Sequence, residues 1–267
     1  SAQARLINDM PLGDGAVKLL NGSGVGVKVN GGDFASFNGL VRFQYKDQIV
    51  GAIELTESQP TNINGSASAQ VMKDFSPTNG QFFLTQGGNL RTEFKNSAFD
   101  SIEGEVTWRY DNPSAKLDGR ITIPRSPIKS ISGEGTARLL QDTAPVQNTQ
   151  LLAGGHLSVK VEANAPKSLT GRVDWKHSNW IGGYVELLEG TNVTGPFKGK
   201  AGATLLAEKP LGGKFTLLKG GNIELGLDST QSLENQQISG MIAVQYDNWL
   251  KGSLTVETKS GAGATFI

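Results

Sequence analysis

Apolar and polar residues alternate in four related stretches of this sequence. Each stretch places an apolar residue, a glycine, a Val or Ile, a second large apolar residue and a Tyr or His at every second position. An alternation with a period of two predicts a half-buried β-strand. The four stretches are Phe37 to Tyr45, Ile102 to Tyr110, Leu169 to His177 and Ile238 to Tyr246.

The glycines in these stretches recur at a nearly constant interval. Gly39, Gly104, Gly171 and Gly240 lie 65, 67 and 69 residues apart by subtraction of their numbers. Self-similarity at a fixed period indicates tandem repeats. We therefore divide the chain into one continuous array of four predicted repeats, at residues 1–62, 63–130, 131–192 and 193–267.

Each predicted repeat contains further short strands. A strand with small residues on its apolar face opens the repeat and ends at an acidic residue, which a proline follows shortly after. A glycine pair such as Gly87-Gly88 then separates two short runs, which predicts a β-hairpin with a positive-φ turn. A last strand carries a second alternate-position glycine, as in Ile49, Gly51 and Ile53. The pattern thus predicts about five antiparallel strands in each repeat.

This patterning predicts an all-β fold whose sheet has to hide its apolar face. Glycines on that face permit sharp bends or close backbone approach. We expect an elongated antiparallel β-repeat structure, rolled or twisted around a narrow apolar interior, in which Trp108 and Trp175 point inward. A compact two-sheet sandwich is the alternative.

Composition and charge narrow the classes of partner. The chain of 267 residues has 25 basic and 25 acidic side chains without a block of one sign, which argues against nucleic acid as a partner. No stretch of about 18 apolar residues predicts a transmembrane helix. The absence of cysteine excludes disulfides and thiolate metal sites. Because the chain starts and ends within the repeat pattern, we expect a fragment of a longer protein.

Residues suited to catalysis are few, so we predict no catalytic, cofactor-binding or metal-binding residues and no cofactor. Of the two histidines, His156 occupies a turn position and His177 replaces a strand-end tyrosine. One acidic residue recurs at the end of each opening strand, which indicates that it bonds nearby backbone donors rather than acting in catalysis. These acids are Asp9, Asp74, Asp142 and Glu208. A calcium site built from scattered aspartates stays open as an alternative.

Two tryptophans are the candidate binding residues. Trp180 and Trp249 each follow an asparagine and precede the last strand of a repeat. Exposed aromatic side chains in a row could stack on sugar rings or on a protein. They could equally fill the seam between neighbouring repeats, which is the interpretation we favour.

The chain also resembles a group of bacterial proteins. Lys209-Pro210-Leu211-Gly212-Gly213, the glycine pairs, and the run of Gly, Val and Tyr before a second glycine are similar to tandem β-repeat segments of very long bacterial proteins associated with secretion or contractile injection. The resemblance implies an elongated scaffold in a secreted or envelope-associated protein, and it transfers no catalytic residue.

These observations favour a non-enzymatic structural or interaction scaffold, an extended β-repeat spacer or shielding module of a larger protein. Its expected partners are adjacent domains of a longer chain or another protein. Binding of a lipid or another apolar ligand in the rolled interior is the first alternative, because the opening strands line it with small residues such as Ala67, Ala69 and Gly133. Carbohydrate binding through Trp180 and Trp249 is the second alternative.

Overall fold

The computed structural model describes residues 1–78, 80–189, 191–232, 235–258 and 265–266. The elements with described bounds in these ranges are all β-strands, and none of the described residues lies in an α-helix. The strands pair antiparallel. The predicted all-β antiparallel fold class is therefore confirmed.

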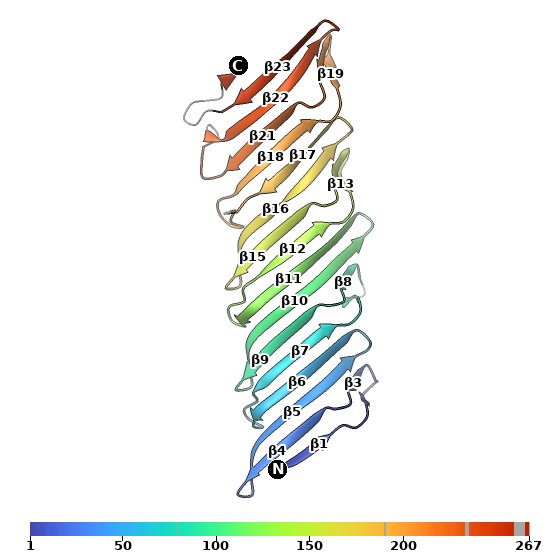
Figure 1. The fold of residues 1–267 in the computed structure, drawn as a ribbon, viewed down its shortest axis with the longest axis vertical. Helices are drawn as coiled ribbons and strands as arrows, with labels where there is room; N and C mark the ends of the chain where they lie inside the picture. Colours follow the sequence, from blue (N-terminus) through green and yellow to red (C-terminus); the bar gives the residue numbers. More distant parts are fainter. Residues whose placement is uncertain (79, 190, 233–234, 259–264, 267) are drawn as a thin grey trace. The chain divides into compact units, whose positions relative to one another are not determined.

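Four kinds of strand recur along the chain, and we label them A to D by their order within a predicted repeat (Figure 1). The A strands are β1 (Ala2–Arg5), β7 (Gly65–Val71), β12 (Gly133–Leu139) and β18 (Lys198–Leu205). The B strands are β4 (Gly24–Asn30), β9 (Asn89–Lys95), β15 (His156–Glu162) and β21 (Asn222–Asp228). The C strands are β5 (Asp33–Tyr45), β10 (Ala98–Asn112), β16 (Ala165–His177) and β22 (Gln237–Tyr246). The D strands are β6 (Ile49–Ser58), β11 (Ala115–Pro127), β17 (Ile181–Leu187) and β23 (Leu250–Glu257).

Each predicted repeat also has one or two short strands between strand A and strand B. They are β2 (Met10–Leu12), β3 (Val17–Leu19), β8 (Phe82–Leu84), β13 (Thr143–Val146), β14 (Thr149–Leu151), β19 (Lys209–Gly212) and β20 (Phe215–Leu217). A final short strand, β24 (Thr265–Phe266), pairs with Val256 and Glu257 of β23.

The prediction of a β-hairpin at each glycine pair is wrong. In the second predicted repeat, β8 and β9 do not pair with each other but lie end to end along the same edge of the long strand β10. Gly87 between them does have the predicted positive φ, of 97°. The glycine pair bonds to the end of strand A instead, since Val71 N–H donates to Gly88 O and Gly87 N–H donates to Val71 O.

The chain divides into two compact units. The first consists of Ser1–Asp111, Asp118–Gly135 and Val161–Ala165, and the second of Asn112–Leu117, Thr136–Lys160 and Pro166–Ile267. In the first unit β1, β4, β5, β6, β7, β9 and β10 pair in this order. In the second unit β16, β17, β18, β21, β22 and β23 pair in this order.

Strand register is the same at corresponding positions of the two units. Strand B meets the C-strand glycine through Val25–Gly39 and Leu90–Gly104 in the first unit, and through Ile223–Gly240 in the second. Strand D meets the next strand A through Gly51–Ala69 in the first unit and Gly183–Ala203 in the second. Because the side-chain period of a strand is two, this common register places corresponding apolar residues on the same face.

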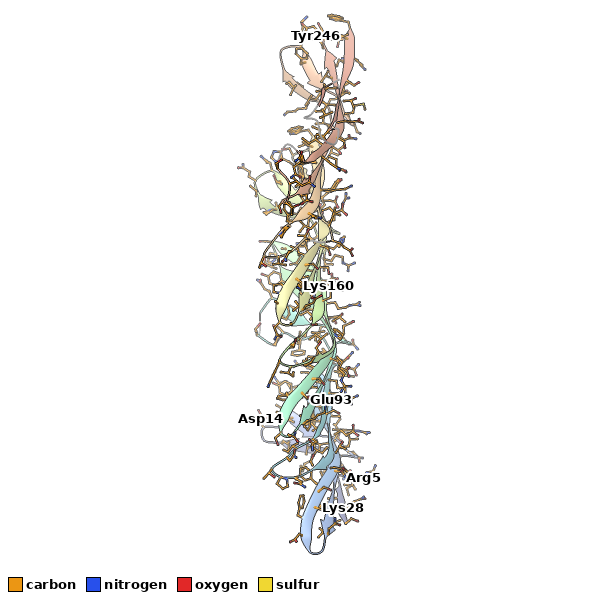
Figure 2. All side chains as sticks on the ribbon, turned by 90° about the vertical axis from the view of Figure 1, so that its left-hand side faces the viewer. Arg5, Asp14, Lys28, Glu93, Lys160 and Tyr246 are labelled. Carbon is orange, nitrogen blue, oxygen red and sulfur yellow. The ribbon has the colours of Figure 1, made fainter. Side chains whose placement is uncertain are left out.

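The expected narrow apolar interior is not what the two units contain. Each unit is one layer of sheet with side chains projecting from both faces (Figure 2). Among the described residues only three hydrophobic side chains are buried, namely Val71, Leu139 and Leu205, at 9%, 8% and 7% exposure. The alternating pattern correctly identifies the apolar face, but that face is half-exposed rather than enclosed.

The C-strand glycines permit close backbone approach, as predicted. A Cβ atom at Gly39 would lie 2.7 Å from the carbonyl oxygen of Gly24, and one at Gly104 would lie 2.3 Å from that of Asn89. The corresponding distance at Gly171 is 2.2 Å, to His156 O. Gly104 and Gly171 also have positive φ, of 142° and 138°. A side chain at these positions would therefore collide with the neighbouring strand.

Aromatic side chains cover the D-strand glycines. Phe43 lies opposite Gly51, and a Cβ at Gly51 would be 2.4 Å from the Phe43 ring. Trp175 likewise lies opposite Gly183, where a Cβ would be 2.8 Å from its ring. A ring that lies over a cross-strand glycine compensates for the missing side chain. This contact, rather than insertion into a core, is the role of Trp175.

Candidate functional site

The two predicted binding tryptophans have different surroundings, although both precede a D strand of the second unit. Trp180 is half-buried, and Lys209 Nζ lies 5.1 Å from the centre of its ring. The ring borders an apolar hollow of about 260 Å³, which Ile181, Leu205 and Ile242 also line. Trp180 thus packs at the seam between strand D of one predicted repeat and the strands that follow.

Trp249 remains open to solvent. It is 71% exposed, and its ring meets the Tyr246 ring edge-on with a centroid distance of 5.7 Å. Tyr246 in turn contacts Phe215 at 4.8 Å. Trp180 and Trp249 therefore belong to two separate clusters and do not form one row of equally exposed rings, which weakens the case for a sugar-stacking platform.

The buried hydrophobic residues mark the seams between predicted repeats. Val71 and Leu205 each end an A strand and lie opposite the first residue of the preceding D strand, Ile49 and Ile181 respectively. Leu139 ends the A strand β12 in the same way. Leu6 is the corresponding residue of the first predicted repeat, but it is only half-buried, since among the described residues β1 pairs with β4 alone.

One backbone hydrogen bond closes each of these seams. The donor is the backbone N–H of the residue that follows the buried aliphatic residue. The acceptor is a backbone carbonyl oxygen immediately before strand D or at the start of that strand. These bonds are Met72 N to Gln48 O at 2.7 Å, Leu140 N to Lys116 O at 2.9 Å and Leu206 N to Trp180 O at 2.7 Å. The recurring bond fixes the register in which one predicted repeat meets the next.

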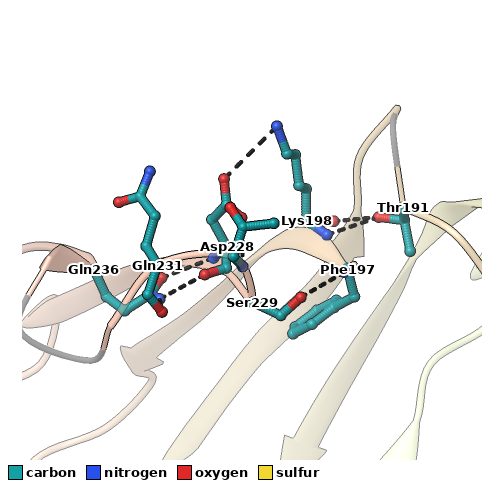
Figure 3. A network of polar contacts seen from close by, with 8 residues as sticks. Thr191, Phe197, Lys198, Asp228, Ser229, Gln231 and Gln236 are labelled. Carbon is teal, nitrogen blue, oxygen red and sulfur yellow. Dashed lines mark hydrogen bonds and ion pairs between the residues drawn. The ribbon is translucent and has the colours of Figure 1, made fainter. Parts of the chain in front are cut away.

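A buried hydroxyl clamps the loop from strand D to the next strand A. Thr191 Oγ1 donates to Lys198 O at 2.6 Å and accepts from Lys198 N at 3.0 Å, and beside it Phe197 N donates to Ser229 Oγ at 2.8 Å (Figure 3). Ser58 makes the same two bonds to Asn64, at 2.7 and 2.9 Å. Ser126 makes them to Ser132, both at 3.3 Å. The sequence pattern did not single out these hydroxyls, each of which lies six or seven residues before its bonding partner at the start of strand A.

The polar face of the second unit carries an ionic network across four strands. Arg172 Nη2 pairs with Asp174 Oδ1 at 2.9 Å, and the guanidinium lies 3.8 Å from the centre of the Tyr184 ring. Tyr184 donates a hydrogen bond to Glu224, which Lys200 also approaches to 3.4 Å. The Tyr184 ring lies over Gly202, where a Cβ would be only 2.4 Å away. The network aligns the strands, and each of its charges has an opposite charge or a ring as partner.

The Tyr184 network predicts a stability change at high pH. The hydrogen bond to Glu224, with desolvation second, raises the pKa of Tyr184 from 10.0 to about 12. The unfolded chain therefore loses this proton near pH 10 while the folded chain retains it, so this contribution to stability is present below pH 10 and is lost as the pH rises toward about 12. The free energy of unfolding, measured with denaturant at several pH values across this window, should fall less steeply with pH in Tyr184→Phe than in the wild type. Equal slopes would contradict the assignment.

The recurring acidic residues have the structural role that we predicted in three of the four repeats. Asp9, Asp74 and Asp142 each accept a backbone N–H with Oδ1 at 2.8 Å, from Asn21, Gln86 and Ala153 respectively. His177 Nδ1 forms a hydrogen bond of 2.8 Å with Thr149 Oγ1, so its tip serves strand pairing between β16 and β14.

Removing one of these acceptors should have a modest effect. We expect Asp142→Ala to lower the free energy of unfolding by about 1 kcal/mol, because the Ala153 amide loses its partner. Asp142→Asn retains a carbonyl acceptor and should lose less. Urea unfolding midpoints measure both, and equal losses would argue that the charge rather than the hydrogen bond matters.

The described ranges contain neither a candidate metal site nor a candidate membrane-spanning helix. Within them no group of three or more His, Cys, Asp or Glu side chains is placed to hold a metal ion. No helix long and apolar enough to span a bilayer is found there either. Comparisons with protein-family models, curated proteins and solved structures found no significant match to the chain.

Proposed function

We propose that this chain is a non-enzymatic structural and interaction scaffold, an extended β-repeat spacer or shielding module of a larger protein. In this proposal residues 1–62, 63–130, 131–192 and 193–267 are tandem repeats, each of which adds one set of A, B, C and D strands. Adjacent domains of a longer chain, or another protein, are its partners.

The observation that supports the proposal is the common construction of the seams. A buried aliphatic residue, a backbone bond beside it and, ahead of it, a hydroxyl clamp occur together around Val71, Leu139 and Leu205. In repeat proteins each repeat contacts only its neighbours, so stability is a sum of repeat and interface terms and length is set by repeat number. A chain whose most buried apolar residues join one repeat to the next is suited to span distance.

Small-angle scattering of the monomer tests the spacer function. A compact chain of 267 residues has a radius of gyration of about 18 Å. A spacer of stacked strands should give a clearly larger value and an elongated distance distribution. A radius near that of a compact chain would reject the spacer proposal.

Deletion of one repeat tests the repeat boundaries. Removing residues 63–130 joins the D strand β6 to the A strand β12, whose seam residues match those of β7. We expect this variant to fold into antiparallel sheet with a smaller radius of gyration, since the new seam reproduces an existing one. Removing residues 63–96, about half a repeat, is the control and should abolish cooperative folding. Loss of folding in both variants would argue against modular repeats.

A further inference from the structure

An apolar hollow of about 260 Å³ lies on the sheet of the second unit, beside the ring of Trp180. It is formed by β20 and by β17, β18, β21 and β22, which follow one another in the sheet (Figure 1). No charged side chain is among the described residues that line it. The apolar side chains around it include those of Ile181, Ala203, Leu205, Leu217, Ile223 and Ile242. The hollow is therefore a candidate site for an apolar group.

Small residues account for the depth of this hollow. Ala203 lies opposite Ile223, and Gly221, which immediately precedes β21, has no side chain. Larger neighbours, among them Leu205 and Ile242, surround these two residues. Ile223 is 38% exposed, so the hollow opens to solvent rather than being sealed inside the sheet. A ligand can therefore enter it without a rearrangement of the strands.

The rim of the hollow differs from the corresponding place in the first unit. Trp180 and Gln48 are counterparts, since each precedes strand D and accepts a backbone hydrogen bond from the residue after a buried seam position. Lys209 and Phe75 are also counterparts, since each pairs with the leucine that ends the short strand before strand B. The second unit thus combines a tryptophan with a cation where the first unit has an amide and a phenyl ring.

The cation at this rim has no acidic partner among the described residues. Lys209 is half-buried, and its Nζ lies 5.1 Å from the centre of the Trp180 ring. Because Lys209 pairs with Leu217, which also lines the hollow, it is held next to the hollow from two sides. Across the described ranges no Asp or Glu forms an ion pair with it. An aromatic ring attracts an ammonium group without neutralising it, so this charge is available to an anion.

We propose that the hollow binds a small amphiphilic carboxylate, whose hydrocarbon part fills the hollow and whose carboxylate pairs with Lys209. Ligand sites commonly combine an apolar lining with a few polar groups that fix the orientation of the ligand. A cavity of about 150 Å³ holds benzene, so the hollow has room for a hydrocarbon group of about eight to ten carbons. The single ammonium group matches a ligand with one negative charge.

Titration with octanoate, followed by tryptophan fluorescence, tests the proposal. The chain has four tryptophans, and Trp180 is the one among the described residues that line the hollow. Octanoate should displace water from its ring and shift the emission to shorter wavelength in a saturable manner, with a dissociation constant in the millimolar range for so small a ligand. Trp180→Phe removes the reporting ring and should abolish this shift.

Variants of Lys209 test the role of the charge. Lys209→Gln should weaken octanoate binding by about fivefold, the upper range for an ion pair near the surface. Binding of 1-octanol, which has the same chain length without the charge, should not change in this variant. Lys209→Arg retains the positive charge and should bind octanoate within about twofold of the wild type, because each twofold change is small on the free-energy scale.

Filling the hollow tests its shape. Ala203→Leu places a larger side chain on the floor of the hollow and should abolish binding of both octanoate and octanol. Ala201→Leu is the matched control, because Ala201 lies two residues away on the same face of β18, opposite Leu225, and is not a lining residue. It should bind both compounds as the wild type does. Circular dichroism establishes which variants are folded, and the Lys209 variants decide the outcome if Ala203→Leu does not fold.

Three results would each overturn the proposal. The first is the absence of a saturable response to octanoate in the wild type. The second is an octanoate affinity that Lys209→Gln leaves unchanged, and the third is binding that persists in a folded Ala203→Leu variant. None of these results affects the scaffold function, which scattering of the ligand-free chain tests separately.

Discussion

Gly104→Ala is expected to destabilise the protein by about 3 kcal/mol or more, the range reached when a mutation collides with backbone at a special φ. The added Cβ would lie 2.3 Å from Asn89 O and 2.9 Å from the Cα of Leu90. Neither atom can move without breaking the pairing of β9 with β10. The φ of 142° adds strain that an L side chain cannot relieve. Equilibrium urea unfolding measures the loss.

Gly135→Ala is the matched control for this prediction. Gly135 also lies in a strand, β12, but no atom is within 4 Å of the position that its Cβ would take. The substitution should leave stability unchanged or raise it slightly, because alanine restricts the unfolded chain more than glycine does. Similar losses at the two positions would show that close approach at Gly104 is not what requires glycine.

Leu205→Ala is expected to lower the free energy of unfolding by about 2 to 3 kcal/mol, near the lower end for a leucine truncated in a packed site. Leu205 is 7% exposed and lies opposite Ile181, at the seam where β17 meets β18. Truncation removes its contacts and enlarges the apolar hollow beside Trp180. Besides urea unfolding, the emission maximum of tryptophan should shift to longer wavelength if the hollow fills with water.

Leu6→Ala is the comparison that separates the contribution of the seam to stability from that of the leucine side chain itself. Leu6 has the same place at the end of an A strand but is only half-buried. In dilute solution the truncation should therefore cost clearly less than Leu205→Ala. Equal losses for the two variants in dilute solution would contradict the role assigned to the seams.

The candidate tryptophans illustrate how far sequence reasoning reaches. Equivalent spacing correctly placed Trp180 and Trp249 immediately before D strands, but it could not distinguish their exposure. That difference depends on whether another strand follows in the sheet, which is a non-local property. The seam clamps Ser58, Ser126 and Thr191 were missed for a related reason: serine and threonine are common in loops, and only the fold reveals which hydroxyl both donates to and accepts from one neighbouring residue.

The sequence by itself determined the strands, their apolar face and the need for glycine at Gly39, Gly104 and Gly171, because a period of two and a missing Cβ are local properties of the chain. Only the tertiary structure decided what lies against that face. Alternation states which side chains share a side of the sheet, not whether a second layer covers them, so the predicted interior gave way to one layer in each unit. Backbone pairing over long sequence separations also decided that β8 and β9 share one edge of β10 and that burial is concentrated where strand D meets strand A.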